Sequence, residues 1–285
     1  MSQYIEAARG GVVVAGISGG KDSAALSLWL TEQGVAHRRV FADTGWEHPA
    51  TYEHLAYLEG VLGPIDRVQC THGGMVDLVR KRGMFPSRLR RFCTQELKAA
   101  PIRRYLSEHE ADVNVVGIRA SESASRARMA EWEWSKDFDC NVWRPLLGWS
   151  EDDVIAIHKR HGVRPNPLYL MGASRVGCWP CIFARKAEVK LVVDTDPARI
   201  ALIAELEAEV EQGARERAEA KGEEHTARTF FHSRGHGQAD NGAMAIGVVA
   251  EWAKTDRGGR QLPLFEDAPD DGCVRWGLCE TGGDP

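Results

Sequence analysis

The sequence predicts an α/β fold, a doubly wound parallel sheet with helices on both faces, followed by a helical, cysteine-bearing C-terminal part. In the first half of the chain, short strand-like runs alternate with helical stretches. This alternation is typical of parallel strands joined by right-handed crossovers. After about residue 140 the alternation stops. We therefore expect two domains, residues 1–170 and residues 171–285.

Strands and helices of similar length are expected in the alternating region. The strands are predicted at residues 11–17, 38–42, 66–70 and 113–118. The helices are predicted at residues 24–33, 49–59, 74–82 and 96–107. Motifs with glycine or charged residues follow three of the strands, at residues 18–23, 43–45 and 117–119. Because ligands of parallel sheets bind at the carboxyl ends of the strands, we expect these motifs to share one site.

The C-terminal part is expected to be mainly helical. Residues 143–146 form a short extended piece, and residues 164–167, which hold two prolines, form a loop. Ser150 is the predicted N-cap of a helix, with Asp153 at the third helical position. Further helices are predicted at residues 182–193 and from residue 197 to about residue 221.

The composition is typical of a soluble globular protein. Of the 285 residues, 43% are hydrophobic and 27% are charged. The chain has no apolar run long enough to cross a bilayer and no apolar core of an export signal, so we expect a cytoplasmic protein without membrane contacts. The net charge of −5 gives no global reason to expect nucleic acid. A local basic cluster at residues 80–91 is either a solubilising loop or an anion-binding surface.

The segment S-G-G-K-D-S lies between the first strand and the first helix. Backbone N–H groups of such a turn and the positive end of the helix converge on one spot, which suits a phosphate. The turn is not a Walker A loop, because Ala15 stands where a glycine is needed and Asp22 follows the lysine. It is not a dinucleotide-binding fingerprint either, because Ser18 interrupts the spacing of the glycines. The alternative is an ordinary glycine-rich turn. The residues of the turn are Ser18, Gly19, Gly20, Lys21, Asp22 and Ser23.

Seven cysteines in a chain without an export signal favour metal binding or thiol chemistry over disulfides. Cys178 and Cys181 have the C-x-x-C spacing that lets two thiolates bind one metal centre. The pair is compatible with a redox pair, a structural zinc site or an iron–sulfur cluster. The redox interpretation is disfavoured because residues 172–177 resemble a loop rather than a strand. Cys93 precedes a helical stretch, whose dipole is expected to lower the pKa of its thiol.

The turn at residues 18–23 resembles the pyrophosphate loop of the PP-loop ATP pyrophosphatases, which cut ATP between the α and β phosphates. An ordered set of motifs over residues 11–185 is similar to the phosphoadenosine phosphosulfate reductase family. The set comprises D-T-G at residues 43–45, F-C-T-x-x-L-K-x-x-P at 92–101, G-I-R-x-x-E-S at 117–123, and N-P-L-Y with the following C-x-x-C at 166–181. The resemblance implies a nucleotide-binding domain of the adenine-nucleotide α-hydrolase type. It adds Asp43, Gly117 and Arg119 to the turn as nucleotide-binding residues.

The resemblance also implies a [4Fe–4S] cluster. In cluster-bearing members, a cysteine at the position of Cys93 joins the C-x-x-C pair, so Cys93, Cys178 and Cys181 are expected ligands. The fourth position is left to Cys273, to Cys279 or to an open iron. Near the C-terminus, Gly277 and Leu278 resemble the catalytic tail of the reductases, but Trp276 replaces their cysteine. A reactive thiol at Cys279 is expected in its place.

The complete loop and the cysteine set together resemble most the adenylating sulfurtransferases, such as those of DNA phosphorothioation. This implies cleavage of ATP with Mg²⁺ to AMP and pyrophosphate, assisted by Lys21 and Asp22, and then sulfur transfer through Cys279. One alternative is a reductase of adenylyl sulfates. Another is a non-catalytic nucleotide-binding subunit with a structural zinc site.

The expected partners follow from that chemistry. The first is an adenine nucleotide. The second is a sulfur donor, either a cysteine desulfurase or a thioredoxin-like protein. A nucleic acid is one candidate for the sulfur acceptor, beside a small metabolite, and a homo-oligomer is expected.

Overall fold

A six-stranded sheet is the centre of the part of the chain that the structure describes. The structure is a computed structural model, and it describes residues 2–232, 242–256 and 276. The strand order is β3-β2-β1-β4-β6-β5. All neighbouring pairs are parallel except β5 and β6, which form an antiparallel pair at one edge. The strands are β1 (Val13–Gly16), β2 (Arg38–Asp43), β3 (Asp66–Gln69), β4 (Val113–Val115), β5 (Trp132–Ser135) and β6 (Cys140–Trp143).

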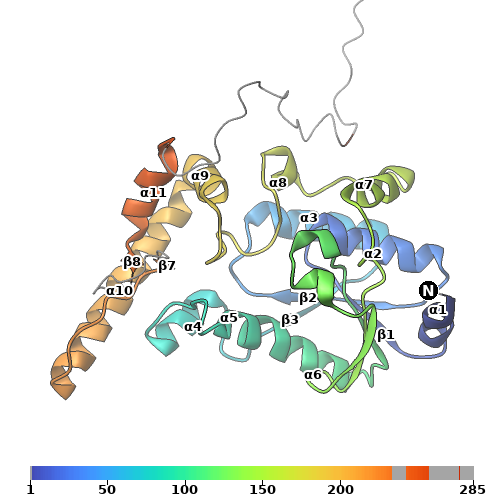
Figure 1. Cartoon of the computed structure of the whole chain (residues 1–285), viewed down its shortest axis with the longest axis horizontal. Coiled ribbons are helices and arrows are strands. Elements are labelled where there is room, and N and C mark those ends of the chain that lie inside the picture. Colours follow the sequence, from blue (N-terminus) through green and yellow to red (C-terminus); the bar gives the residue numbers. More distant parts are fainter. Residues whose placement is uncertain (1, 233–241, 257–275, 277–285) are drawn as a thin grey trace, which may run out of the picture.

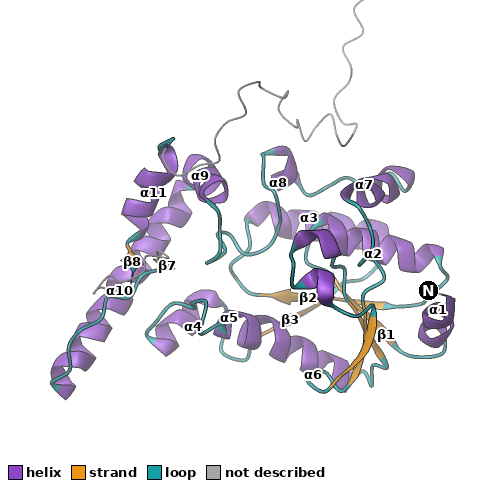
Figure 2. Ribbon diagram, viewed as in Figure 1, coloured by secondary structure: helices purple, strands orange, loops and turns teal. Residues whose placement is uncertain are grey.

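Helices cover both faces of this sheet, as the prediction of a doubly wound fold requires. One face carries α2 (Lys21–Glu32), α3 (Pro49–Leu62) and α7 (Glu151–Arg160) (Figure 1). The other carries α4 (Met75–Arg82), α5 (Phe92–Thr94) and α6 (Ala100–Glu108), with the π-helical turn η1 (Gln95–Ala99) between the last two. The remaining short helices of this part are α1 (Ser2–Arg9), η2 (Ala120–Glu122), η3 (Arg126–Arg128) and α8 (Pro167–Leu170). Figure 2 shows the purple helices on both sides of the orange strands.

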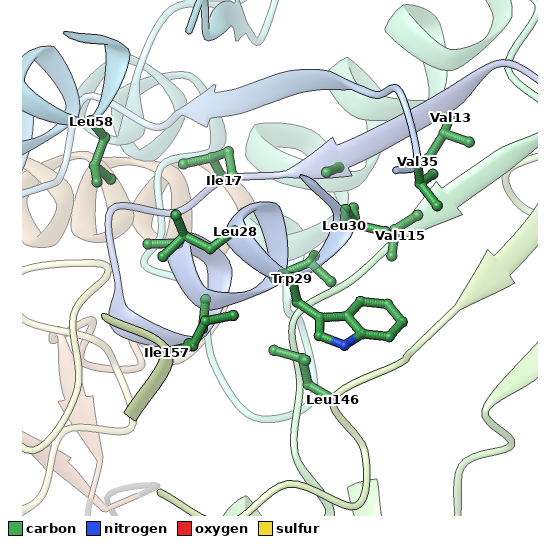
Figure 3. Packing of buried hydrophobic residues seen from close by; sticks show 14 of the residues in the cluster. Val13, Ile17, Leu28, Trp29, Leu30, Val35, Leu58, Val115, Leu146 and Ile157 are labelled. Atoms are coloured by element: carbon green, nitrogen blue, oxygen red, sulfur yellow. The ribbon is translucent and has the colours of Figure 1, made fainter. Parts of the chain in front are cut away.

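Helix α2 is buried because almost every side chain on it is small or apolar. It packs between the sheet and α7, and Trp29 lies edge-on against Trp143 of β6, with 5.5 Å between the ring centroids. Figure 3 shows the Trp29 ring beside Leu146, and Leu28 between Ile17, just after β1, and Ile157. The core therefore fixes the start of α2, and with it the turn at residues 18–23.

A helical arm follows the sheet region. It consists of α9 (Lys186–Thr195), α10 (Pro197–Lys221) and α11 (Ile246–Lys254), with a small hairpin of β7 (Phe231–His232) and β8 (Ala243–Met244). The arm extends to the left of the sheet in Figure 1. A second apolar cluster joins α10 and α11 to α4 through residues such as Leu78 and Leu206. The division into domains at residue 170 stays a prediction.

The buried carboxylate of Glu207 holds this arm together. One of its oxygens accepts the N–H of Phe230 at 2.9 Å, and the other accepts the N–H of Ile246 at 2.8 Å. The residue is only 8% exposed, and burial raises the pKa of Glu207. The carboxylate thereby fixes the strand β7 and the start of α11 against α10.

Several predicted elements are confirmed with different ends. The predicted Ser150 cap is confirmed, since Ser150 Oγ accepts the N–H of Asp153 at 3.1 Å. The helix at residues 197–221 is α10. The helix predicted from residue 24 begins at Lys21, because Gly20 is its N-cap. The helix predicted from residue 96 begins earlier, because α5 and η1 run into α6 without a break.

Other elements are present, but their predicted ends were wrong. The strand predicted over 113–118 ends at Val115, and the extended piece at 143–146 belongs to a strand that ends at Trp143. Residues 182–185 are not helical, because α9 begins at Lys186. Its N-cap is Arg185, whose N–H donates to the Glu188 carboxylate at 2.7 Å. The predicted loop at 164–167 includes the first residue of α8. In the described part of the chain, no helix is both long and apolar enough to cross a bilayer.

Candidate nucleotide and thiol site

The turn at residues 18–23 is closed by its own serines. Ser23 Oγ accepts the N–H of Ser18 at 3.1 Å and donates to the carbonyl of Gly20 at 2.9 Å. Gly19 has φ of +73°, and a Cβ there would lie 2.8 Å from Thr51 Cγ2, so this position requires glycine. The helix α2 begins at Lys21, directly after the turn. The positive end of the helix therefore faces the space in which the sequence predicts a phosphate.

Residues from far along the chain hold the backbone of the turn. The hydroxyl of Tyr169 accepts the N–H of Lys21 at 3.2 Å, and His158 Nε2 lies 2.9 Å from the carbonyl of Lys21. Asn166 donates to the carbonyl of Gly19 at 3.1 Å. These residues come from α7, α8 and the segment between them. They therefore fix the backbone of the turn through contacts between segments that are distant in sequence.

The ammonium group of Lys21 lies among acidic and aromatic groups. Its Nζ is 3.3 Å from Glu151 Oε1 and 3.5 Å from Asp22 Oδ2, and 4.9 Å from the centroid of the Tyr169 ring. Burial lowers the pKa of Lys21, but Tyr169, Asp22 and Glu151 outweigh burial, and the net shift is upward. The lysine is therefore charged at neutral pH and ready to pair with an anion.

The end of β4 approaches the same turn. Arg119 is buried and its Nε donates to Asp22 Oδ1 at 2.5 Å. A Cβ at Gly117 would lie 2.8 Å from the carbonyl oxygen of Asp22, so glycine permits this close approach. The structure thus brings Gly117 and Arg119 to the turn, as the sequence predicts.

Asp43 lies at the end of β2, and its carboxylate is held locally. Its oxygens accept from the N–H of Gly45 at 2.9 Å, from the Tyr52 hydroxyl at 2.8 Å and from Gln69 Nε2 at 2.8 Å. Strands β1 and β2 are neighbours and parallel. Asp43 therefore shares a sheet edge with the turn, and its contact with a nucleotide stays a prediction.

The loop with Cys178 and Cys181 is attached to the segment after β2. Trp46 Nε1 donates to the carbonyl of Pro180 at 2.9 Å, and the N–H of Trp179 donates to the carbonyl of Trp46 at 2.8 Å. Glu47 and Cys178 form an antiparallel β-bridge. These bonds attach the C-x-x-C pair to the segment that follows β2. Because β1 and β2 are parallel neighbours, the pair and the turn both lie at the carboxyl ends of the strands.

Two cations accompany the thiols, the half-buried Lys98 and the exposed Arg175. Burial raises the pKa of Cys178, while the neighbouring Lys98 lowers it. Burial lowers the pKa of Lys98, but Cys178, Glu47 and Cys181 outweigh it and raise the pKa overall. Burial also lowers the pKa of Arg175, which Glu188 and Cys181 raise. A thiolate at Cys178 or Cys181 therefore has a positively charged side chain beside it.

The expected acidic shift at Cys93 was wrong. Burial raises the pKa of the Cys93 thiol, and the nearby Cys181 raises it further. The helix that contains Cys93 is a single turn followed by the π-helical turn η1, so its dipole is short. Desolvation therefore outweighs the helix end at this position.

Cys181 interacts electrostatically with both the Cys93 thiol and the Cys178 thiol, and it raises the pKa of each. A thiolate-bound group with negative charge fits this donor set, because Lys98 and Arg175 offset the charge of the sulfur atoms. Within the described residues, no three His, Cys, Asp or Glu side chains are arranged to hold a single metal ion. Cys273 and Cys279 lie outside the described residues. The cluster and its fourth ligand therefore stay predictions.

Sequence reasoning missed three residues at the turn: Glu151, His158 and Trp276. Trp276 is 7% exposed, and its ring lies 5.2 Å from that of His158 and 6.4 Å from that of Tyr169. It therefore packs on the two side chains that hold the backbone of Lys21. No local signal marks these residues, because their importance depends on contacts between segments more than 100 residues apart.

Known proteins similar to this chain match the part of it that contains the turn and the C-x-x-C pair. A family profile described as "Phosphoadenosine phosphosulfate reductase domain" matches residues 12–184. The chain belongs to the phosphoadenosine phosphosulfate reductase domain family. The resemblance stated from the motifs is thereby confirmed. The matched range of this family domain includes the turn, the end of β4 and the three expected cluster ligands, Cys93, Cys178 and Cys181.

Two relatives of the family domain illustrate the range of similarity. An uncharacterised 37.8 kDa protein of Escherichia phage 186 is 34% identical over 330 residues, covering 94% of this chain and 96% of the relative. Adenosine 5'-phosphosulfate reductase of Allochromatium vinosum is 32% identical over 151 residues, covering 50% of this chain and 57% of the relative. Among solved structures, phosphoadenylyl-sulfate reductase from Candida auris matches with a TM-score of 0.48 at 17% identity, covering 59% of this chain and 81% of that chain.

Proposed function

We propose that this member of the family is an adenylating sulfurtransferase, which cleaves ATP to AMP and pyrophosphate and then transfers sulfur to the adenylated acceptor. The observation that carries the proposal is the complete turn at residues 18–23, which includes the charged Lys21, together with the attachment of the C-x-x-C loop to the segment after β2, at the same ends of the parallel strands. A substrate that is already adenylated needs no site for a leaving pyrophosphate. ATP does need one.

In the first step, an acceptor oxygen attacks the α-phosphorus of ATP. The bond between the α-phosphorus and the α,β-bridging oxygen breaks, and pyrophosphate leaves with the electron pair. The N–H groups of Gly19 and Gly20 and the ammonium group of Lys21 would bind the leaving pyrophosphate, where concentrated positive charge stabilises the transition state. Carboxylates at Asp22 and Asp43 would bind Mg²⁺, which prefers oxygen ligands.

In the second step, a hydrosulfide-level donor attacks the acceptor atom that bears the activated oxygen. A bond from that atom to sulfur forms, its bond to oxygen breaks, and AMP leaves with the oxygen. Cys93, Cys178 and Cys181 would hold a [4Fe–4S] cluster, with Cys273, Cys279 or no protein ligand at the fourth iron. Such a cluster supplies a site that binds and activates sulfide. Where Cys279 carries the sulfur instead, a cysteine desulfurase would load it as a persulfide, whose outer sulfur would displace AMP from the acceptor. A thioredoxin-like dithiol would then cleave the resulting S–S bond, which leaves the sulfur on the acceptor and oxidises the dithiol to a disulfide.

A second candidate function is reduction of an adenylyl sulfate to sulfite. It is favoured by the relatives named adenosine 5'-phosphosulfate reductase, which match 33% to 51% of this chain in the Neisseria and Burkholderia proteins. This reaction needs a thiol reductant and no ATP. The third candidate, a non-catalytic nucleotide-binding subunit with a zinc site, predicts turnover of neither substrate.

One anaerobic experiment separates these functions. The protein is incubated with ATP, Mg²⁺, hydrosulfide and a mixture of DNA and RNA oligonucleotides, and pyrophosphate and AMP are measured. We expect release of both, and a loss of about 100- to 1,000-fold in Lys21→Ala, because one charge-stabilising donor is removed. Lys159→Ala is the control, since Lys159 is an exposed lysine at the far end of α7. Sulfite release from an adenylyl sulfate without ATP would overturn the proposal in favour of the reductase.

A further inference from the structure

An exposed basic turn borders the thiols. It consists of residues 87–91, and its Arg88, Leu89, Arg90 and Arg91 are all exposed, Leu89 to 97%. The sequence left the wider cluster at residues 80–91 open between a solubilising loop and an anion-binding surface. The structure separates the two parts of that cluster.

The first part, on α4, is largely neutralised. Arg80 pairs with Glu209 of α10 at 2.7 Å, and Arg82 pairs with Glu96. Within the described residues, none of the cations of the basic turn forms an ion pair with a carboxylate. Their charge therefore stays uncompensated in a chain whose net charge is −5.

The basic turn is held in shape. The N–H of Ser87 donates to the carbonyl of Arg90 at 3.1 Å, and the N–H of Arg90 donates back to Ser87 Oγ at 3.2 Å. Before the turn, Phe85 is buried against Phe230, with 5.6 Å between the ring centroids. The turn thus presents its side chains from a fixed base, and ordering it on binding costs little entropy.

Its last residue connects it to the thiols. The guanidinium of Arg91 lies over the ring of Phe183, 5.3 Å from the centroid, and donates to Thr94 Oγ1 at 3.3 Å. Thr94 follows Cys93, and the N–H of Phe183 lies 3.5 Å from the sulfur of Cys181. A molecule bound along the basic turn would therefore lie beside the cysteines.

We propose that the basic turn binds the sugar-phosphate backbone of a nucleic acid and holds it as the sulfur acceptor. A small anion is bound by converging, buried donors, whereas these arginines lie apart on an exposed turn, which fits an extended polyanion. Arginine also stacks on bases, and an exposed Leu89 between arginines suits contact with an unstacked base or sugar. The binding stands by itself, but the role as acceptor rests on the proposed function.

Fluorescence anisotropy with labelled single-stranded and duplex oligonucleotides tests the binding. The full-length protein is titrated at several salt concentrations, and the slope of log K against log salt is measured. In the double variant Arg88→Gln/Arg90→Gln we expect the slope to fall by about 0.7 to 0.9 for each lost phosphate contact, together with at least a roughly tenfold rise in Kd near 0.1 M salt. The control Lys136→Gln/Lys159→Gln removes the same charge from exposed positions outside the turn and should keep the wild-type slope.

The outcomes are distinguishable. An unchanged slope in the arginine variant, or an equal fall in the control, would overturn the proposal. Equal binding of polyglutamate with the same salt slope would also overturn it, in favour of an acidic protein. Lys21→Ala should bind the oligonucleotide like the wild type, even if it releases no pyrophosphate. If the oligonucleotides bind but no pyrophosphate forms, the proposed function fails while the docking surface stands.

Discussion

Removal of one hydroxyl group tests whether residues distant in sequence fix the backbone of the turn. Tyr169→Phe keeps the buried ring but removes the oxygen that accepts the N–H of Lys21. Burial raises the pKa of Tyr169, so the hydroxyl is neutral at pH 7 to 9 and the loss is that of a neutral hydrogen bond. The ring leaves no large cavity, so the cost is mainly that of an unsatisfied buried N–H group, about 1–3 kcal/mol.

Urea unfolding followed by tryptophan fluorescence measures this cost. The matched control is Tyr57→Phe, because the Tyr57 hydroxyl also accepts a backbone N–H, that of Arg164 at 3.0 Å, but at an exposed site. Water replaces the lost oxygen there, so the control should lose less than about 0.5 kcal/mol. ATP binding should weaken only in Tyr169→Phe. Equal losses of stability in the two variants, or no loss in Tyr169→Phe, would refute the reasoning.

Three further predictions concern the close approach, the arm and the distant tryptophan. Gly117→Ala should lose nucleotide binding measured by calorimetry, since its Cβ would meet the backbone oxygen of Asp22 at 2.8 Å, whereas Gly148→Ala, with open space around it, should bind normally. The raised pKa of Glu207 means that the folded state keeps this proton to higher pH than the unfolded state. Its contribution to stability is therefore present below the ordinary pKa of 4.5 and falls as pH rises through the folded pKa; Glu207→Gln should flatten that part of a pH series of urea midpoints. Trp276→Ala should raise the apparent Kd for ATP about 2- to 10-fold, from the loss of an aromatic pair of about 0.5–1.5 kcal/mol, and an unchanged Kd would contradict a role at the turn.

The sequence predicts those parts of the fold that depend on local chemistry. The turn at residues 18–23, the cap at Ser150 and the helix at 197–221 each depend on neighbouring residues, and each is where the pattern indicates. The parallel sheet follows from the alternation of elements. The carboxyl ends of β1 and β4 then bring Gly117 and Arg119 to the turn.

The parts that could not be predicted depend on tertiary contacts. The hydrogen bond from the N–H of Lys21 to the Tyr169 hydroxyl joins residues 148 positions apart, and no sequence pattern near either residue indicates it. The helix α9 starts late because Arg185 is its N-cap and donates its N–H to Glu188, three residues further on. The pKa of Cys93 rises because the apolar cluster that includes the helical arm buries its thiol. The spacing of the cysteines in the sequence does not indicate such burial.

The ion pair between Lys21 and Glu151 has a consequence for selectivity. Without a ligand, the lysine already has an acidic companion on α7, only 3.3 Å away. An incoming anion must compete with that internal carboxylate, and a multiply charged pyrophosphate group competes better than a singly charged ion. Glu151 thus disfavours singly charged anions: in Glu151→Gln, chloride should inhibit nucleotide binding at concentrations that the wild-type protein tolerates.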